Sequence, residues 1–292
     1  MPLWTDIGPE QAPLYSRSKM EQRRCALVTG ASRGIGQAVA QRLASDGLRV
    51  FGASREPSDG TGSGVEPVVL DVTDDDSVRA AVDAVFGTAG RLDVVVNNAG
   101  TTLLGALEET STDEARWLID TNLLGVHRVT RATLAHLRAS RGHAVVMGSV
   151  AGFLAMPVEG FYSATKHALE AYAEVLRMEV APFGVRVALV EPGFVRTDFA
   201  SNAHPVGTPL ALYDHMRRTL SHGLSHDVEK GIDVAEVAEC VSRIVSTEAP
   251  KLRHLVGRDA MRLRRLKSLM PDGMFEWGLR RRFGLAKGPV KI

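Results

Sequence analysis

Short runs of apolar, largely β-branched residues alternate with longer segments of helical periodicity along most of the chain. The runs are almost continuously apolar, which is typical of strands whose two faces are both covered. Strand followed by helix, repeated, predicts an α/β fold with a parallel sheet, helices on both faces and right-handed connections. The expected strands lie at 25–29, 49–53, 67–70, 92–96, 144–148 and 185–190, with a further one near 253–256. The expected helices lie at 35–46, 75–86, 112–140, 161–181 and 234–246.

The bulk properties of the chain exclude several other classes of protein. Its 292 residues suffice for one large domain, and 45% hydrophobic and 24% charged residues are ordinary for a globular protein. The 35 basic side chains nearly balance the 34 acidic ones, so no overall charge favours a nucleic-acid partner. The two cysteines, Cys25 and Cys240, form no disulfide framework and fit a reducing cytoplasm. No apolar run approaches the ~20 residues that span a membrane.

Three parts of the chain lie outside the repeating pattern. Residues 1–23 form a polar leader without the apolar core of a signal peptide. Residues 194–231 follow the sixth expected strand, lack clear periodicity and are expected to form a lid over the carboxyl edge of the sheet. Residues 258–292 are a basic extension with the pattern of one or two amphipathic helices. The main domain is therefore expected to span 24–257.

The first expected strand runs directly into the sequence TGASRGIG, residues 29–36. Glycines permit backbone angles closed to other residues, and they allow a phosphate to approach the main-chain amides closely. The start of the following helix adds unpaired N–H groups and a partial positive charge. The glycines stand at positions 30, 34 and 36, a spacing that differs from the commonest dinucleotide-binding pattern. Because the strand–turn–helix context is right, we expect a nucleotide-binding turn rather than a purely structural one.

The end of the second expected strand bears on which dinucleotide would bind. An acidic residue there would bind the ribose 2′-hydroxyl and repel a 2′-phosphate. Ala53 stands near that position, Arg55 follows closely, and Arg33 lies inside the glycine turn. Two guanidiniums without an early carboxylate favour NADP over NAD. The alternative is that Glu56 pairs with Arg55, which would weaken that preference.

Asp71 follows the third expected strand in the sequence LDVTD. Its carboxylate is a candidate acceptor for a hydrogen bond from the adenine amino group of a dinucleotide. Alternatively, Asp71 and Thr73 cap the helix that follows. The sequence leaves both roles open.

The segment GFYSATKHALEAY, residues 160–172, places Tyr162 and Lys166 four positions apart. On a helix this spacing brings two side chains to one face, one turn from each other. A phenol has a pKa near ~10 and is a poor acid or base at neutral pH. An ammonium about 4 Å away is worth about 4 kcal/mol at an effective dielectric near ~20, or about three pKa units. The pair therefore predicts a tyrosine whose pKa is lowered toward neutrality for acid–base chemistry.

These segments occur in a characteristic order with NNAG at 97–100, Asn122, Ser149, and the pair PG at 192–193 followed by Thr197. In this order they resemble the short-chain dehydrogenase/reductase family, single-domain branch, over about residues 24–247. The segment 149–197 is most similar to 17-beta-hydroxysteroid dehydrogenases, retinol dehydrogenases and bacterial ketoreductases. The resemblance implies a Rossmann-type, doubly wound sheet of seven strands in the order 3-2-1-4-5-6-7. It also implies nicotinamide-dependent interconversion of a ketone and an alcohol.

The resemblance implies a role for each matching residue. Tyr162 would donate a proton, Lys166 would tune Tyr162 and bind the cofactor ribose, and Ser149 would hydrogen-bond the substrate oxygen. Asn122 would hold a water that links Lys166 to solvent. The alternative roles are a turn residue for Ser149 and a structural hydrogen bond for Asn122. The residues expected to contact the cofactor are Gly30, Ser32, Arg33, Gly34, Ile35, Gly36, Arg55, Asp71, Val72, Asn98, Ala99, Gly100, Tyr162, Lys166, Pro192, Gly193, Val195 and Thr197.

The expected lid and the strand ends suggest a largely apolar pocket for a bulky ketone of steroid, polyketide or terpenoid type. The apolar side chains of this region could equally serve to pack the lid. No paired metal-ligand spacing occurs among the nine histidines, so no metal site is expected. The residues expected to contact the substrate are Ser149, Phe153, Tyr162, Phe199, Tyr213 and Met216.

The leading interpretation is a cytoplasmic ketoreductase that uses NADP(H), with NAD(H) as the less favoured cofactor. The alternatives are an NAD-dependent alcohol dehydrogenase that runs oxidatively and a catalytically silent, cofactor-binding regulatory protein. The resemblance also implies a homodimer or homotetramer built on helices 112–138 and 161–181. For the basic extension, packing on the substrate side is favoured over subunit contact, and peripheral membrane attachment is favoured least.

Overall fold

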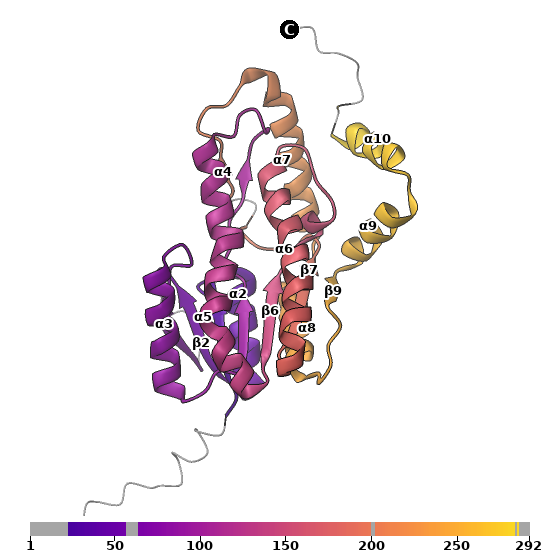
Figure 1. Ribbon diagram of the computed structural model, residues 1–292. Coiled ribbons are helices and arrows are strands. Elements are labelled where there is room, and N and C mark those ends of the chain that lie inside the picture. The colour runs from indigo at the N-terminus through magenta and orange to yellow at the C-terminus, as the bar shows by residue number, and fades with distance from the viewer. Residues whose placement is uncertain (1–22, 57–63, 200–201, 284, 286–292) are drawn as a thin grey trace, which may run out of the picture.

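The computed structural model describes residues 23–56, 64–199, 202–283 and 285. Its centre is a parallel sheet of seven strands in the order β3-β2-β1-β4-β6-β7-β9 (Figure 1). Counted along the chain within this sheet, the order is 3-2-1-4-5-6-7, so the predicted Rossmann-type topology is confirmed. The strands are β1 (Cys25–Thr29), β2 (Arg49–Ser54), β3 (Val65–Val69), β4 (Val94–Asn97), β6 (His143–Met147), β7 (Arg186–Pro192) and β9 (Arg253–Val256).

Helices cover both faces of the sheet and make a three-layered body (Figure 1). Successive residues of a strand point to opposite faces, so Leu27 of β1 packs into one apolar layer and Val28 into the other. Both layers are buried, which explains why the strands are apolar at nearly every position. The first layer is covered by α3 (Asp75–Ala89), α5 (Gly125–Ser140) and α6 (Gly160–Val180), and the second by α2 (Gly34–Ser45) and α8 (Val234–Ser246).

The expected strand boundaries differ from the observed ones by one or two residues, and β3 shows a physical reason. This strand begins at Val65, two residues before the expected start, and includes Pro67. Proline has no N–H to donate to a ladder, so it is confined to edge strands or strand ends. β3 is an edge strand that pairs only with β2, and it therefore tolerates the proline.

The helix expected over 112–140 is interrupted. The structure divides it into α4 (Thr112–Ile119), a π-helical turn (Asp120–Leu124) and α5. The turn ends at Gly125, where a Cβ would come too close to the side chain of Val72. Such turns insert one extra residue and frequently lie at functional sites. The inserted turn carries Asn122 into the interior, where only 1% of the residue is exposed.

The segment 194–231 has more regular structure than its sequence suggested. Its short strand β8 (His204–Pro205) pairs with β5 (Leu103–Leu104), and α7 (Asp214–Glu229) follows. Leu220 and Leu224 of α7 are buried in a small apolar cluster of their own. The segment lies beyond the carboxyl edge of the sheet (Figure 1), which is where the lid was expected.

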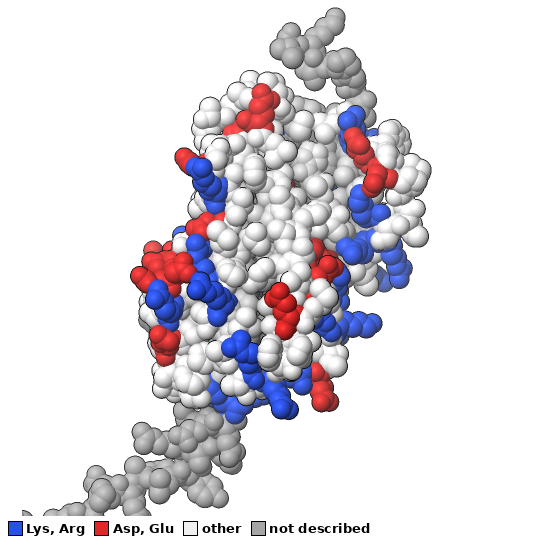
Figure 2. Space-filling model, viewed as in Figure 1, with Lys and Arg blue, Asp and Glu red and all other residues white. Residues whose placement is uncertain are grey.

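The C-terminal extension forms α9 (Arg258–Leu269) and α10 (Asp272–Arg282), which lie together along one side of the molecule (Figure 1). Leu279 packs against Phe153 and its neighbours, while Phe283 is buried in the same cluster as α7. Figure 2 shows basic side chains gathered over these two helices. Of the three arrangements considered for the extension, packing on the lid and the main domain is the one that these contacts show. The expected leader, except for its last residue, and residues 286–292 of the extension lie outside the described residues.

Over the described ranges, no helix combines the length and the apolar character that crossing a bilayer requires.

Candidate functional site

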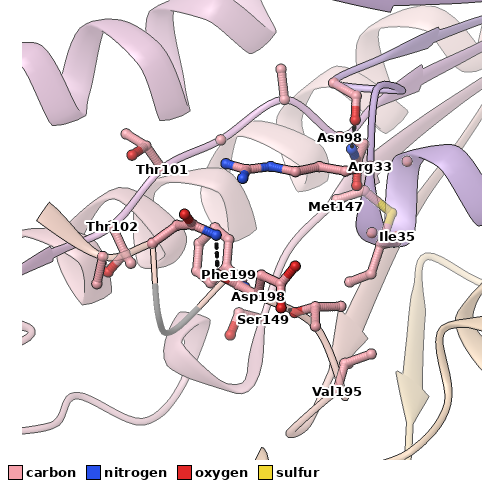
Figure 3. A pocket seen from close by; sticks show the side chains of 18 of the residues that line it. Arg33, Ile35, Asn98, Thr101, Thr102, Met147, Ser149, Val195, Asp198 and Phe199 are labelled. Carbon is pink, nitrogen blue, oxygen red and sulfur yellow. Dashed lines mark hydrogen bonds between the residues drawn. The ribbon is translucent and has the colours of Figure 1, made fainter. Parts of the chain in front are cut away.

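A cleft of about 1480 Å³ opens at the carboxyl edge of the sheet. The strand order reverses there, between β1 and β4, and ligands of doubly wound sheets bind at such a switch point. The glycine turn, the carboxyl ends of the central strands and the lid segment provide its walls (Figure 3). All eighteen residues expected to contact a cofactor line this cleft. Ser149 lines it as well, whereas Asn122 does not.

The glycine turn leaves main-chain amides available to a ligand. Gly30 and Gly34 have φ angles of +65° and +57°, a region that favours glycine. At Gly36 a Cβ would overlap the carbonyl oxygen of Gly30 and the amide of Asn98. The N-cap residue of α2, Arg33, forms no side-chain cap, and the first turn contains no acidic residue. The N–H groups of the first turn of α2 therefore suit an anion such as the pyrophosphate of a dinucleotide.

Asn98 holds the switch point together. Its Nδ2 donates to the carbonyl oxygens of Thr29 and Gly30 at 3.0 and 3.2 Å. In return, the hydroxyl of Thr29 accepts from the main-chain N–H groups of Asn98 and Ala99, both at 3.0 Å. The side chain of Asn98 thus ties β4 to the glycine turn (Figure 3). Asn98, Ala99 and Gly100, all expected to contact the cofactor, line the cleft at this point.

The end of β2 provides a polar surface for the adenosine side of a dinucleotide. Arg33 and Arg55 are both exposed and line the cleft, and Figure 3 shows the Arg33 guanidinium reaching over it. Ser54 also lines the cleft, and its buried hydroxyl has no hydrogen-bond partner among the described residues. Sequence reasoning missed Ser54, although its place directly before Arg55 was a usable signal. No ion pair joins Arg55 to Glu56 in the described part of the chain, so the competing role for Arg55 is not seen.

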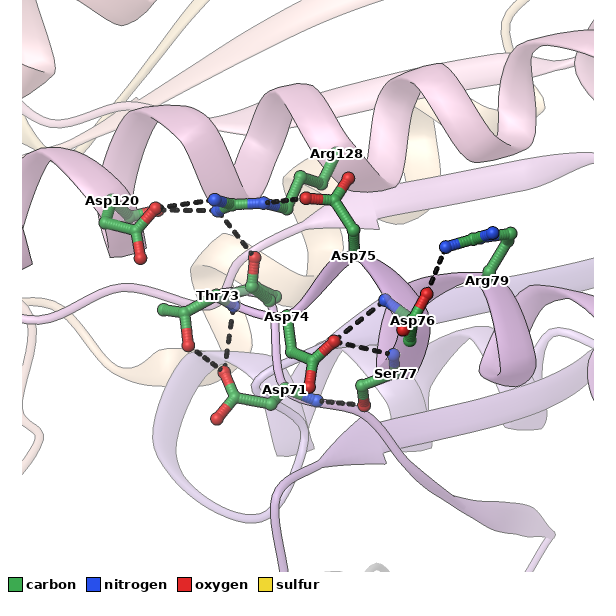
Figure 4. Close-up of polar contacts among 10 residues, drawn as sticks. Asp71, Thr73, Asp74, Asp75, Asp76, Ser77, Arg79, Asp120 and Arg128 are labelled. Atoms are coloured by element: carbon green, nitrogen blue, oxygen red, sulfur yellow. Dashed lines mark hydrogen bonds and ion pairs between the residues drawn. The ribbon is translucent and has the colours of Figure 1, made fainter.

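The structure bears on the two roles considered for Asp71, helix cap and hydrogen-bond acceptor. Asp74, not Asp71, caps α3, because its carboxylate accepts two main-chain N–H groups at 2.8 and 3.1 Å (Figure 4). Asp71 accepts both the N–H and the hydroxyl of Thr73, at 2.9 and 2.7 Å. Partial burial acts to raise the pKa of Asp71, but these bonds and two nearby guanidiniums lower it overall. Asp71 is therefore an ionised acceptor in the cleft wall.

Ser149, Tyr162 and Lys166 come together in the wall of the cleft. The hydroxyl of Ser149 accepts the N–H of Ala151 at 3.1 Å and is near enough to Tyr162 to lower the pKa of its phenol. Lys166 donates from Nζ to the carbonyl oxygen of Met147 at 2.9 Å. The same Nζ lies 5.8 Å from the centroid of the Tyr162 ring. The first turns of α6 thus aim both side chains at the end of β6.

Burial dominates the electrostatics of these three residues. It raises the pKa of Tyr162, the carboxylate of Glu159 raises it further, and the hydrogen bond with Ser149 lowers it. Burial also lowers the pKa of Lys166 to about 8. The expectation that Lys166 brings Tyr162 close to neutrality therefore needs correction, because loss of solvent around the phenol and the nearby Glu159 carboxylate raise the pKa of Tyr162.

Asn122 forms structural hydrogen bonds, which were considered as the alternative to holding a water. Its Oδ1 accepts the N–H of Thr101 at 2.8 Å, and its Nδ2 donates to the carbonyl oxygen of Thr101 at 2.9 Å. Nδ2 also donates to the hydroxyl of Thr165, at 3.1 Å, on α6 between Tyr162 and Lys166. Both amide hydrogens are used within the protein. The side chain therefore connects the π-helical turn to the helix that carries Tyr162.

The turn after β7 is fixed from behind by the C-terminal extension. Asp259 of α9 accepts the N–H of Phe194 at 2.7 Å, and its carboxylate fills the space beside Gly193. Pro192, Val195 and Thr197 of this turn line the cleft with Gly193, as expected for residues that would hold a nicotinamide. Asp259 stands in no motif, and the sequence offered no signal for it.

The residues expected to contact a substrate divide into two groups. Phe199 lines the cleft, and its ring centroid lies 5.9 Å from that of Tyr162. Phe153, Tyr213 and Met216 do not line it and need correction. Phe153 is buried beneath the tail helices, and the other two pack the lid, where the Tyr213 hydroxyl donates to Glu108 at 2.6 Å. Their apolar character was correctly identified, but packing on α9, α10 and α7 decides which way they face.

The lid end of the cleft contains lining residues that sequence reasoning missed. We use this name for the part bounded by β5, α4, the lid and the start of α6. None of the missed residues belongs to a motif, and only the helical spacing of those on α7 was visible in the sequence. They are Trp117, Glu159, Phe194, Leu224 and Val228.

Within the described residues, no group of three or more His, Cys, Asp or Glu side chains could hold a metal ion.

Gly36→Ala tests the close approach at the glycine turn. We expect it to weaken nucleotide binding by more than about tenfold, or ~1.4 kcal/mol, because its methyl group would displace the Gly30 carbonyl and Asn98. Fluorescence titration with NADPH and NADH measures this loss. Gly87→Ala in α3, where a Cβ meets nothing within 4 Å, is the matched control and should bind normally. Full affinity in the Gly36→Ala protein would contradict a tight cradle.

Comparison with known proteins gives a consistent result. Residues 24–205 match the sequence model of the short chain dehydrogenases. The chain is 37% identical over 264 residues to the 3-ketodihydrosphingosine reductase of Bacteroides thetaiotaomicron, covering 89% of this chain and 97% of that protein. It is 31% identical to the NADPH-dependent 3-dehydrocapnine reductase of Ornithobacterium rhinotracheale, covering 87% and 95% of the two chains. Identity to human 17-beta-hydroxysteroid dehydrogenase type 1 is 34%, with 86% and 83% covered.

A solved structure shows the same fold. A short-chain dehydrogenase from Streptomyces avermitilis superimposes with a TM-score of 0.75 at 35% identity, covering 89% of this chain and 98% of that one. The sheet order, the cleft at its switch point and the relatives' sequences thus lead to one assignment. The chain belongs to the short-chain dehydrogenase family and is an oxidoreductase that acts on carbonyl or hydroxyl groups.

Proposed function

We propose that this protein reduces a ketone on a bulky hydrophobic substrate to a secondary alcohol and uses NADPH to do so. The observation that carries the proposal is the gathering of Ser149, Tyr162 and buried Lys166 in the wall of a cleft that begins at a phosphate cradle. Two of the similar proteins are named as reductases, which supports the reductive direction.

Each side chain of this site has a task in such a reduction. NADPH, when bound, supplies the hydride to the ketone carbon. Ser149 donates a hydrogen bond to the ketone oxygen, where negative charge develops. Tyr162 donates its proton to the same oxygen as a general acid. Because burial raises the pKa of Tyr162, the phenol holds that proton at neutral pH, as a donor in the reductive direction must.

Lys166 sets how readily Tyr162 releases the proton. A unit charge 5.8 Å from the Tyr162 ring is worth about 3 kcal/mol at an effective dielectric near ~20, or about two pKa units. This attraction stabilises the phenolate and opposes the effect of burial. With a pKa of about 8, Lys166 is still mostly charged at pH 7. We therefore propose that Lys166 stabilises the Tyr162 phenolate that remains after the proton has been transferred.

Three observations support NADPH rather than NADH. Arg33 and Arg55 face the cleft as exposed guanidiniums, and no acidic residue stands at the end of β2. The hydroxyl of Ser54, which has no hydrogen-bond partner in the described parts of the chain, is a suitable donor to a ribose 2′-phosphate. One similar protein is named as NADPH-dependent.

The substrate class follows from the lid end of the cleft. Leu104, Met156, Phe199 and Leu224 line it beside Tyr162 and present an apolar surface. The similar proteins named for 3-ketodihydrosphingosine, 3-dehydrocapnine and a 17-beta-hydroxysteroid support a large hydrophobic ketone. This surface favours a long or polycyclic hydrocarbon over a sugar.

Tyr162→Phe removes the proton donor and little else. We expect turnover of a hydrophobic ketone to fall by at least about 10²-fold, while NADPH affinity stays within about threefold. Absorbance of NADPH measures turnover, and fluorescence titration measures binding. Tyr172→Phe, on the same helix but outside the cleft wall, is the matched control. Substantial activity in the Tyr162→Phe protein would refute the proposed mechanism.

Cofactor choice is tested by titrating the protein with NADPH and NADH. We expect Arg33→Ala and Arg55→Ala each to weaken NADPH binding about tenfold, since a charge-assisted hydrogen bond is worth about 1.5–3 kcal/mol. NADH binding should change by less than about twofold. Arg79→Ala, which removes an exposed partner of Asp76 outside the cleft, controls for loss of a positive charge. Tighter binding of NADH than NADPH by the unmodified protein would overturn the preference.

We also propose that two copies associate through the outer faces of α5 and α6. Large apolar side chains remain exposed along these helices and at their ends, while Figure 2 shows a broad uncharged area between charged margins. The exposed residues are Leu124, Val175, Met178 and Phe183.

Met178→Glu would place a charge in the centre of that face, where Met178 is 67% exposed. We expect it to shift the protein from dimer or tetramer to monomer in size-exclusion chromatography with light scattering, because a buried unpaired charge opposes association. Val69→Glu, on the edge strand β3 and 64% exposed, is the matched control. An unmodified protein that is already monomeric would exclude this interface.

A further inference from the structure

The lid end of the cleft contains a buried carboxylate, one oxygen of which has no hydrogen-bond partner among the described residues. Glu159 lines the cleft and is only 6% exposed. Its Oε2 is buried without a hydrogen-bond partner, and neither oxygen forms an ion pair among the described residues. Glu159 is the N-cap residue of α6, yet its side chain makes no capping bond. Within the described residues, the fold therefore gains no hydrogen bond from Oε2 and no ion pair from this carboxylate.

A second buried glutamate, Glu109, shows what a structural role looks like. Glu109 is 5% exposed, and its Oε2 accepts the N–H of Ala106 at 2.8 Å. Its other oxygen accepts the N–H of Leu210 at 2.7 Å and pairs with Arg217. Buried carboxylates are normally satisfied in this way, because an unpaired one loses its hydration without compensation. Oxygens of Glu159, Glu170 and Glu191 depart from this rule among the described residues, and of these three glutamates only Glu159 lines the cleft.

The backbone around Glu159 is held in a conformation that a valine rarely adopts. Val158 has a φ of +58°, which is a strained region for a β-branched residue. A hydrogen bond of 2.9 Å from the N–H of Gly105 to the carbonyl oxygen of Val158 secures this geometry. Strain of this kind persists where the surrounding structure enforces it, and it gathers at binding and active sites.

Glu159 also lies within electrostatic reach of the reacting atoms. It precedes Tyr162 by three positions, which is one turn of helix, and its charge acts on the Tyr162 phenol. Burial raises the pKa of Glu159 to about 7, so a cation placed beside it would return it to the ionised form. The other glutamate at the lid end, Glu114, accepts the N–H of Gly207 at 2.7 Å and bonds to Ser111. Of the two glutamates described at the lid end, Glu159 is thus the one with a buried oxygen open to a ligand.

We infer that Glu159 binds a protonated amine carried by the substrate on a carbon next to the ketone. The inference rests on the proposed ketone reduction, because the ketone oxygen must lie at Ser149 and Tyr162 for the amine to reach Glu159. The apolar residues of the lid end, including Leu104 and Leu224, then take the hydrocarbon chain. The substrate class is accordingly a long-chain 2-amino ketone, bound by an ion pair at one end and by apolar contact along the rest.

Steady-state kinetics with two matched ketones tests this inference. One is 3-ketodihydrosphingosine, a long-chain ketone with an amino group on the neighbouring carbon, and the other is the same ketone without the amine. We expect kcat/KM to be at least about tenfold higher for the amino ketone. Glu159→Gln should remove this preference mainly by raising KM for the amino ketone, because any effect of the lost charge on Tyr162 acts on both ketones alike and cancels in the ratio of their kcat/KM values. Glu159→Asp, which keeps the charge, should retain part of the preference.

Glu114→Gln is the matched control, because it neutralises a satisfied carboxylate at the same end of the cleft and should affect both ketones alike.

Reduction of both ketones at equal kcat/KM would overturn the role of Glu159 and leave the proposed function intact. Reduction of neither ketone would instead refute the proposed function. In that case calorimetric binding of dihydrosphingosine and of its amine-free analogue to the NADP-loaded protein decides the inference. A preference for the amine that Glu159→Gln abolishes supports it, and equal binding overturns it.

Discussion

The site depends on one junction in the sheet, the reversal of strand order between β1 and β4. Parallel strands on either side of this junction carry their connections to opposite faces, so no helix closes the carboxyl edge above it. Four hydrogen bonds cross it and fix the glycine turn against β4: the Thr29 hydroxyl accepts the N–H groups of Asn98 and Ala99, and the Asn98 side chain donates to the carbonyl oxygens of Thr29 and Gly30. The glycine turn, the hydroxyls of Ser149 and Tyr162, and the lid all lie at this edge.

A second theme is that the chemistry relies on polar groups deprived of water. Tyr162, Lys166 and Glu159 are each less than a tenth exposed, and burial moves the pKa of each away from its ordinary value. In such surroundings a single charge acts over a longer range than in solvent. The proton donor, the cation that stabilises it and the proposed amine-binding carboxylate therefore influence one another, and the first turns of α6 set their spacing.

Most of the fold could be predicted from the sequence because its signals are local. Continuous β-branched runs mark the central strands, and the spacing of Gly30, Gly34 and Gly36 marks the cradle. The resemblance brought Ser149, Tyr162 and Lys166 into one cleft wall, where the structure places them. Features that depend on contacts between distant segments were not predictable. Phe153 faces α9 and α10 rather than the cleft, and the π-helical turn that buries Asn122 interrupts an apparently regular helical pattern.

The bond between Asp259 and Phe194 has an evolutionary consequence. It joins residues 65 positions apart, so the first turn of the C-terminal extension forms the back of the turn after β7. A gene fusion or exchange that replaced everything beyond β9 would also alter the wall opposite the glycine turn. The extension and that wall consequently form one heritable unit, and changes that adapt the tail to a new partner must preserve its first turn.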